Sequence, residues 1–90
     1  MIRIVIADDQ MLFREGLRTL LSTRNDFEIV GEASDGEEAI ALVETLHPNV
    51  VLMDLRMPRL DGIQATVRIR ERWPSTAILV LTTFDDDANL

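Results

Sequence analysis

Short apolar runs alternate along this chain with longer segments whose apolar residues recur at helical spacing. Three of the runs are bounded by polar residues or proline, which predicts strands. The run in residues 49–54 has four consecutive apolar residues, which fits a strand buried on both faces of a parallel sheet. A fourth segment alternates apolar residues with acids, which is typical of a half-exposed edge strand. The predicted strands are residues 3–7, 27–33, 49–54 and 77–81, and Phe27, Ile29, Gly31 and Ala33 alternate with Glu28, Val30 and Glu32 in the second.

The segments between the strands carry three amphipathic helical patterns. In residues 10–23 the apolar face holds Phe13, Leu17, Leu20 and Leu21. In the segment that starts near Ser34 and Asp35 and ends at Leu46, the inward residues are Ala39, Ile40, Val43 and Leu46. In residues 62–72, with Asp61 as the cap, they are Ile63, Thr66, Val67 and Ile69. Residues 85–87 resemble the acidic start of one more helix.

Strands and helices therefore alternate from the first element to the last. Short right-handed crossovers turn this order into a parallel sheet with helices on both faces. If the first strand lies in the middle, the sheet order is 2-1-3-4, and the winding reverses between the first and third strands. We predict an α/β fold with a doubly wound parallel sheet, forming one domain over residues 1–90.

Composition excludes several classes of protein. The chain has 90 residues, 47% hydrophobic and 28% charged, which describes one globular domain. The net charge of -7 argues against nucleic-acid binding by this segment. The absence of cysteine excludes disulfides and thiol chemistry. The apolar runs are too short for a membrane span and the first residues do not resemble a signal peptide, so we expect a cytoplasmic protein without membrane contact.

Three carboxylates follow the predicted strands that flank the point of reversal. Asp8 and Asp9 come after the first strand and Asp54 ends the third, which places all three at the ligand-binding crevice of such a sheet. Taken alone, Asp54 could simply form a turn. Two ionised carboxylates about 4 Å apart repel by roughly 4 kcal/mol at an effective dielectric near 20, so a cation is expected between them. An all-oxygen ligand set without a contiguous calcium loop favours Mg²⁺, and a carboxylate beside Mg²⁺ can attack phosphorus.

Together these residues closely resemble the receiver domain of two-component response regulators. The motifs that carry the resemblance, in the family's order and spacing, are Asp8-Asp9, Asp54, Met57-Pro58, Asp61-Gly62 and Thr82. The resemblance covers all 90 residues. The stretches 7–10 and 81–86 are most similar to the NarL/FixJ branch, in which a LuxR-type helix-turn-helix follows the receiver. The fold implied is the flavodoxin-like order 2-1-3-4, with the family's fifth strand and fifth helix missing.

The resemblance also implies a role for each site residue. Asp54 would accept a phosphoryl group from a sensor histidine kinase. Asp9 and Asp54 would bind Mg²⁺ directly together with the backbone carbonyl of Arg56, and Asp8 would act through water. Thr82 would turn its hydroxyl toward the phosphoryl group, and Arg56 and Phe84 would flank the site. The protein would be a signalling phosphoacceptor rather than an enzyme, and it would reach DNA only through an output domain outside this chain.

One element of the family pattern has no counterpart in this chain. The family's phosphoryl-binding lysine follows the fifth strand, whereas all nine basic residues here are arginine. We therefore expect phosphorylation and switching of the 90-residue chain alone to be impaired. The apolar, uncharged strand at 77–81 would also lie at the sheet edge, which predicts self-association or a homodimer through it.

Two other functions and several plainer residue roles stay open. A phosphohydrolase of the haloacid dehalogenase type also uses an Asp after a strand, but it expects a second Asp where Arg56 stands. A module that dimerises without phosphorylation is the third possibility. The plainer roles are strand ends for Thr82 and Thr83, a helix cap for Asp61, a helix end for His47 and core packing for Met53 and Met57.

Overall fold

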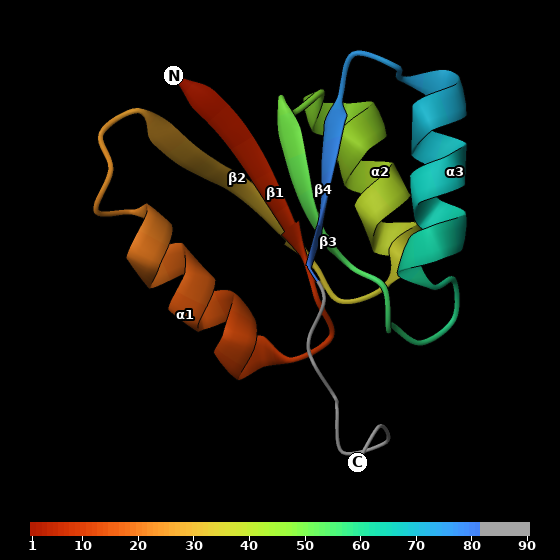
Figure 1. Ribbon diagram of the computed structural model, residues 1–90, viewed down its shortest axis with the longest axis horizontal. Helices are drawn as coiled ribbons and strands as arrows, with labels where there is room; N and C mark the ends of the chain where they lie inside the picture. Colours follow the sequence, from red (N-terminus) through yellow and green to blue (C-terminus); the bar gives the residue numbers. More distant parts are fainter. Residues whose placement is uncertain (82–90) are drawn as a thin grey trace.

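The computed structural model describes residues 1–81, which form a four-stranded sheet with helices on both faces (Figure 1). The elements are β1 (Ile2–Ala7), α1 (Met11–Leu21), β2 (Phe27–Ala33), α2 (Gly36–Leu46), β3 (Val50–Asp54), α3 (Gly62–Arg72) and β4 (Ala77–Leu81). All strand pairs are parallel and their order is β2-β1-β3-β4. Helix α1 covers one face, while α2 and α3 lie side by side on the other. The predicted fold class and sheet order are confirmed, and the helix start predicted at residues 85–87 lies outside the described residues.

The two central strands are apolar at successive positions because each supplies both faces of the sheet. Toward α2 and α3, Val5 of β1 packs with Val51 and Met53 of β3, and none of the three is exposed. Toward α1, Ile4 and Ile6 pack with Leu52. Burial of β1 and β3 on both faces fixes the relative position of their carboxyl ends.

A bulge in β2 changes the faces that the sequence pattern predicts. Ile4 pairs with Ile29, but the next residue, Val5, pairs with Gly31, so Val30 is an extra residue in the strand. The simple alternation predicted for this strand is therefore wrong. Before the bulge, Phe27 and Ile29 pack with the cluster under α1, and after it Ala33 belongs to the cluster under α2 and α3. A further consequence is that Glu32 pairs with Ile6 on the α1 side of the sheet.

The inward face of α3 is also different from the prediction. Ile63 and Val67 are 58% and 52% exposed, whereas Ala65 and Ile69 are fully buried. The small side chain of Ala65 suits the side of α3 that packs closely against the sheet and α2. In α1, Leu17 and Leu21 contact the sheet as predicted, but Leu20 is 65% exposed. The predicted face of α2 is correct, since Ala39 and Val43 are fully buried and Ile40 and Leu46 pack against them.

Side chains or special backbone angles mark the ends of the helices. The backbone N–H of Glu38 donates to Asp35 Oδ1 at 2.8 Å, and that of Gln64 donates to Asp61 Oδ1 at 2.9 Å, so both acids are N-caps. His47 ends α2 in the left-handed region, with φ 47°. The expectations of a cap for Asp61 and a helix end for His47 are therefore confirmed. Met53 and Met57 are core residues, as predicted.

Candidate functional site

Three carboxylates meet at the carboxyl ends of β1 and β3. One oxygen each from Asp8, Asp9 and Asp54 lies within 4.8 Å of the other two. Ala7 pairs with Met53 in the sheet, so the residues that follow them leave the strands side by side. Figure 1 shows that these strand ends lie at the same edge of the sheet. The predicted convergence of the three acids at the switch point is thus present in the structure.

Two of the three carboxylates are buried and the third is exposed. Asp8 is 1% exposed and Asp54 is 4% exposed, whereas Asp9 is an exposed residue. Asp54 ends a strand that is buried on both faces, and Asp8 follows another. Both buried carboxylates are therefore held on rigid strand ends, and solvent reaches the cluster beside Asp9.

The carboxyl of Asp8 has a raised pKa. Burial raises the pKa of its carboxyl, and the negative charges of Asp54 and Asp9 raise it further, against the lowering effect of the Gln10 hydrogen bond. That bond runs from the backbone N–H of Gln10 to Asp8 Oδ1 at 2.8 Å. The second oxygen, Oδ2, is buried without a hydrogen-bond partner among the described residues. A buried carboxylate oxygen without a donor is destabilising unless a proton or a cation satisfies it.

The donor set fits a hard divalent cation. All three side chains offer oxygen, and oxygen ligands at 2.0–2.1 Å from one Mg²⁺ lie roughly 3–4 Å apart, which a cluster of this size allows. The unsatisfied Oδ2 of Asp8 is the atom that a bound ion or its water would satisfy. The exposed side of the cluster leaves room for the waters that Mg²⁺ retains.

The segment between β3 and α3 is tied down at both of its ends. The backbone N–H of Arg56 donates to Asp54 Oδ1 at 3.2 Å, and that of Gly62 donates to the carbonyl of Leu55 at 3.1 Å. Further along, the N–H of Gly36 donates to the carbonyl of Leu60 at 2.8 Å. These bonds fix the backbone that leaves Asp54, including the peptide group of Arg56.

An ion pair also connects the segment between β3 and α3 to the start of α2, and the sequence did not predict it. Arg59 Nη1 lies 2.8 Å from Oδ2 of Asp35, the buried N-cap of α2. Arg59 has a φ of 62°, a left-handed conformation that non-glycine residues rarely adopt. One carboxylate thus caps α2 through Oδ1 and contacts the β3–α3 segment through Oδ2. Neither a left-handed backbone angle at an arginine nor an ion pair between two distant segments produces a periodic pattern in the sequence. Hydrophobic periodicity therefore could not predict this contact.

The other predicted residues are placed as follows. Asp61 caps α3 and His47 ends α2, and neither belongs to the group of candidate metal-binding acids. Arg56 is exposed and follows Asp54 by two positions, but the use of its carbonyl as a ligand stays a prediction. Thr82, Thr83 and Phe84 lie outside the described residues. The phosphoacceptor role of Asp54 and the switch role of Thr82 likewise stay predictions.

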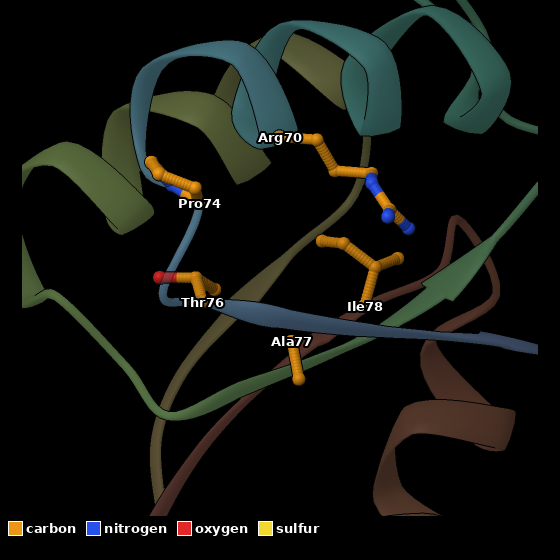
Figure 2. A pocket seen from close by; sticks show the side chains of 5 residues that line it. All are labelled: Arg70, Pro74, Thr76, Ala77 and Ile78. Atoms are coloured by element: carbon orange, nitrogen blue, oxygen red, sulfur yellow. The ribbon is translucent and has the colours of Figure 1, made fainter.

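A pocket of about 340 Å³ opens at the other end of the sheet (Figure 2). Its lining residues are Arg70, Pro74, Thr76, Ala77 and Ile78. In the β3–β4 register Ala77 pairs with Val50, while Leu81 pairs with Asp54. The pocket therefore lies at the amino ends of the strands, about four residues or roughly 13 Å from the acids, and is not part of their site.

None of the described helices is long and apolar enough to cross a membrane.

The class that the fold and site define is a doubly wound α/β domain with three acids at the switch point of its sheet. Residues 4–90 match the family model of the response regulator receiver domain. The chain therefore belongs to the receiver domain family of response regulators, as its sequence motifs indicated.

Comparison with individual proteins gives the same family. The chain is 45% identical over 87 residues to the transcriptional regulatory protein DegU of Brevibacillus brevis, covering 97% of this chain and 37% of DegU. The receiver domain of the putative response regulator NarL from Mycobacterium tuberculosis superposes with a TM-score of 0.87 at 39% identity, covering 97% of this chain and 70% of that one. A LuxR-family DNA-binding response regulator from Staphylococcus aureus also gives 0.87, at 30% identity, with 99% and 74% covered. The chain spans less than half the length of the curated relative DegU.

Proposed function

We propose that Asp54 accepts a phosphoryl group from the phosphohistidine of a sensor histidine kinase, with Mg²⁺ bound by the neighbouring acids. The observation that carries this proposal is the cluster of Asp8, Asp9 and Asp54 on two adjacent strand ends. Membership of the receiver family supports the same role. The transfer forms a bond between a carboxylate oxygen of Asp54 and phosphorus while the bond from phosphorus to the histidine nitrogen breaks.

The residues of this chain divide the work between them. Asp9 and Asp54 would hold the cation together with the backbone carbonyl of Arg56, and Asp8 would act through water. Mg²⁺, when bound, neutralises charge on the phosphoryl oxygens and offsets the repulsion among the acids. The strand end that carries Asp54 keeps its nucleophilic oxygen in a fixed position, which favours attack. Thr82 turns its hydroxyl toward the phosphoryl group once it is attached.

The proposal treats the chain as a signalling module. In this proposal the chain acts as the receiver, and the phosphoryl group controls a LuxR-type output domain that contacts DNA. The LuxR-family relatives support this part of the proposal. The exchange with the kinase takes place in the cytoplasm. Asp54 keeps the phosphoryl group as an acyl phosphate until hydrolysis restores the carboxylate, so the protein acts as a signalling acceptor and not as an enzyme with its own substrate.

Binding of beryllofluoride, a mimic of the phosphoryl group, tests the proposal directly. The protein encoded by the full reading frame is titrated with beryllofluoride in the presence and absence of Mg²⁺, and binding is measured by calorimetry. We expect binding that requires Mg²⁺ and disappears in Asp54→Asn. Phosphorylation by acetyl phosphate should be lost in the same variant.

Asp61→Asn is the matched control, because it makes the same substitution at an aspartate that caps α3. This variant should bind beryllofluoride as the wild type does. Binding that survives in Asp54→Asn, or that does not depend on Mg²⁺, would contradict the proposal. A wild-type protein that neither binds beryllofluoride nor accepts phosphate, but still dimerises, would instead support an interaction module without phosphorylation.

A further inference from the structure

Arg14 connects the segment that carries the acids to a neighbouring strand. Its Nη1 donates to the backbone carbonyl of Asp8 at 2.5 Å, and its Nε donates to Glu32 Oε1 at 3.1 Å. The side chain of Arg14 is 14% exposed and that of Glu32 is 25% exposed, so solvent screens this pair only in part. The guanidinium of Arg14 therefore links α1 to the residue that follows β1 and to β2, at the edge of the sheet.

The start of α1 has few other features that could fix its position. Its N-cap residue, Gln10, makes no side-chain hydrogen bond to the helix, and the first turn contains no acidic residue. No residue of α1 is buried, in contrast to α2 and α3. Local capping and core packing therefore constrain this helix start less than the other two. The contacts of Arg14 supply a constraint that those features do not.

The carbonyl that Arg14 contacts lies directly before Asp9 in the chain. It belongs to the peptide group between Asp8 and Asp9, and that group is planar. Asp8 itself is held by its N–H, which donates to the carbonyl of Ala33 at 3.0 Å, and by its Oδ1, which accepts from Gln10. Asp9 is exposed and lacks the support of a strand. Fixing the peptide plane before it limits the directions in which its carboxylate can point.

The bulge at Val30 makes this arrangement possible. Because Val30 is an extra residue, Glu32 pairs with Ile6 and lies on the face that α1 covers. Without the bulge, Glu32 would point to the opposite face, beyond the reach of Arg14. The bulge and the arginine are thus two parts of one connection between β2 and the acids.

Arg18 provides an internal comparison. It also pairs with Glu32, through Oε2, but its side chain is 51% exposed, and among the described residues no side-chain hydrogen bond joins it to the segment that carries Asp8. The two arginines lie one helical turn apart on α1 and share one carboxylate partner. They differ in whether they contact the backbone of the acid cluster.

We propose that Arg14 is a positioning residue for the acid cluster, acting through the Asp8–Asp9 peptide group to orient Asp9 for cation binding. This inference rests on the proposed function, since it assumes that the cluster binds Mg²⁺. Residues that orient metal ligands from outside the coordination shell typically change metal affinity by 10–100-fold when they are removed. The planar guanidinium makes both contacts at once, which the single ammonium of a lysine cannot do in the same geometry.

The test compares Mg²⁺ affinity in matched variants of the full-length protein. Mg²⁺ alone is titrated by calorimetry into the wild type, Arg14→Gln, Arg14→Lys and Arg18→Gln. We expect about a tenfold or greater loss of affinity in Arg14→Gln and Arg14→Lys and an unchanged affinity in Arg18→Gln. Equal affinities in Arg14→Gln and Arg18→Gln would overturn the proposal. Full recovery in Arg14→Lys would also overturn it, because charge alone would then explain the effect.

A second readout does not depend on bound metal. Amide hydrogen exchange of residues 8–11, measured with a chelator present, should be faster in Arg14→Gln than in Arg18→Gln or the wild type. If the wild type binds no Mg²⁺, the proposed function fails, and exchange that is unchanged by Arg14→Gln would show that the positioning also fails. If Arg14→Gln does not fold, Glu32→Ala takes its place, because it removes the carboxylate that accepts from Arg14 Nε and leaves the donor to Asp8. That variant should also weaken Mg²⁺ binding, and an unchanged affinity would count against the inference.

Discussion

A Cβ atom added to Gly62 would lie 2.1 Å from the carbonyl oxygen of Asp54. The first residue of α3 therefore touches the last residue of β3, backbone against backbone. No side chain fits between them, so the start of α3 packs directly on the strand end that carries Asp54. The glycine in the Asp61-Gly62 motif is thus explained by close approach rather than by an unusual dihedral angle, since Gly62 has no positive φ.

Gly62→Ala should destabilise the fold and weaken the site together. Forcing a methyl group into this contact is expected to lower the free energy of unfolding by about 1–3 kcal/mol, because backbone must shift to admit it. Gly16→Ala is the control, since a Cβ at Gly16 meets nothing within 4 Å and the residue lies inside α1. That change should raise stability by about 0.5–1 kcal/mol. Urea unfolding measures the stability of both variants through the fluorescence of Trp73, the only tryptophan of the 90 residues. A Gly62→Ala variant as stable as the wild type would refute the packing argument.

Asp8→Asn should remove a pH dependence of stability in metal-free protein. Because the pKa of Asp8 is raised in the folded state, the folded protein holds this proton more tightly than the unfolded chain. The stability from this group is present below the unfolded pKa, near 3.9, and is lost as pH rises through the raised folded value. Asp8→Asn, which cannot ionise, should therefore gain stability relative to the wild type across that rise. Denaturation at a series of pH values with a chelator present checks this, with Asp61→Asn as the control.

Addition of Mg²⁺ should make the wild type more stable than Asp8→Asn, the reverse of their order without metal. A ligand present at 100 times its dissociation constant stabilises the folded state by about 2.7 kcal/mol. We expect this gain in the wild type, whose three acids are complete, and a smaller gain in Asp8→Asn. Equal Mg²⁺ stabilisation of both proteins would mean that Asp8 takes no part in binding.

The sequence predicted the position of the acids because strand ends obey simple rules. Asp8 and Asp54 follow apolar runs whose burial on both faces is visible as continuous hydrophobicity, and parallel strands at a switch point bring their carboxyl ends together. Element type and order followed from the same periodicities. The roles carried by Thr82 and the Arg56 carbonyl depend on the family resemblance and stay predictions.

The sequence did not predict features that depend on packing between elements. The alternation of side chains in the sequence does not change at the extra residue Val30, so the pattern does not reveal the bulge. The face of Glu32 was therefore assigned wrongly. In α3, Ile63 and Val67 formed a plausible apolar stripe, yet close contact with α2 and the sheet selected the stripe that contains Ala65. Periodicity identifies a helix, but the space available beside it decides which face turns inward.

The two capping acids offer a measurement of the Asp35–Arg59 ion pair. Asp35→Ala and Asp61→Ala each remove one N-cap, which typically lowers stability by about 1 kcal/mol. Asp35→Ala should be more destabilising, because it also removes the partner of Arg59. The pair term should be about 0.2–1 kcal/mol, since the Arg59 side chain is 69% exposed and solvent screens its charge. A double-mutant cycle with Arg59→Ala measures this term, and a coupling of zero would show that the contact does not stabilise the loop.

The outer edge of β4 should make the 90-residue chain associate with itself. Among the described residues β4 has β3 as its only strand neighbour, and Leu79 and Val80 are 58% and 42% exposed. An apolar, uncharged edge strand pairs readily with a second copy, and a lysine on it disfavours that pairing. Light scattering behind a sizing column should show concentration-dependent association that Leu79→Lys suppresses. Leu12→Lys is the control, because Leu12 is 83% exposed but lies in helix α1, whose backbone does not pair with a strand. If both variants suppress association equally, the contact involves general hydrophobic surface, and a monomer at high concentration would exclude the edge as an interface.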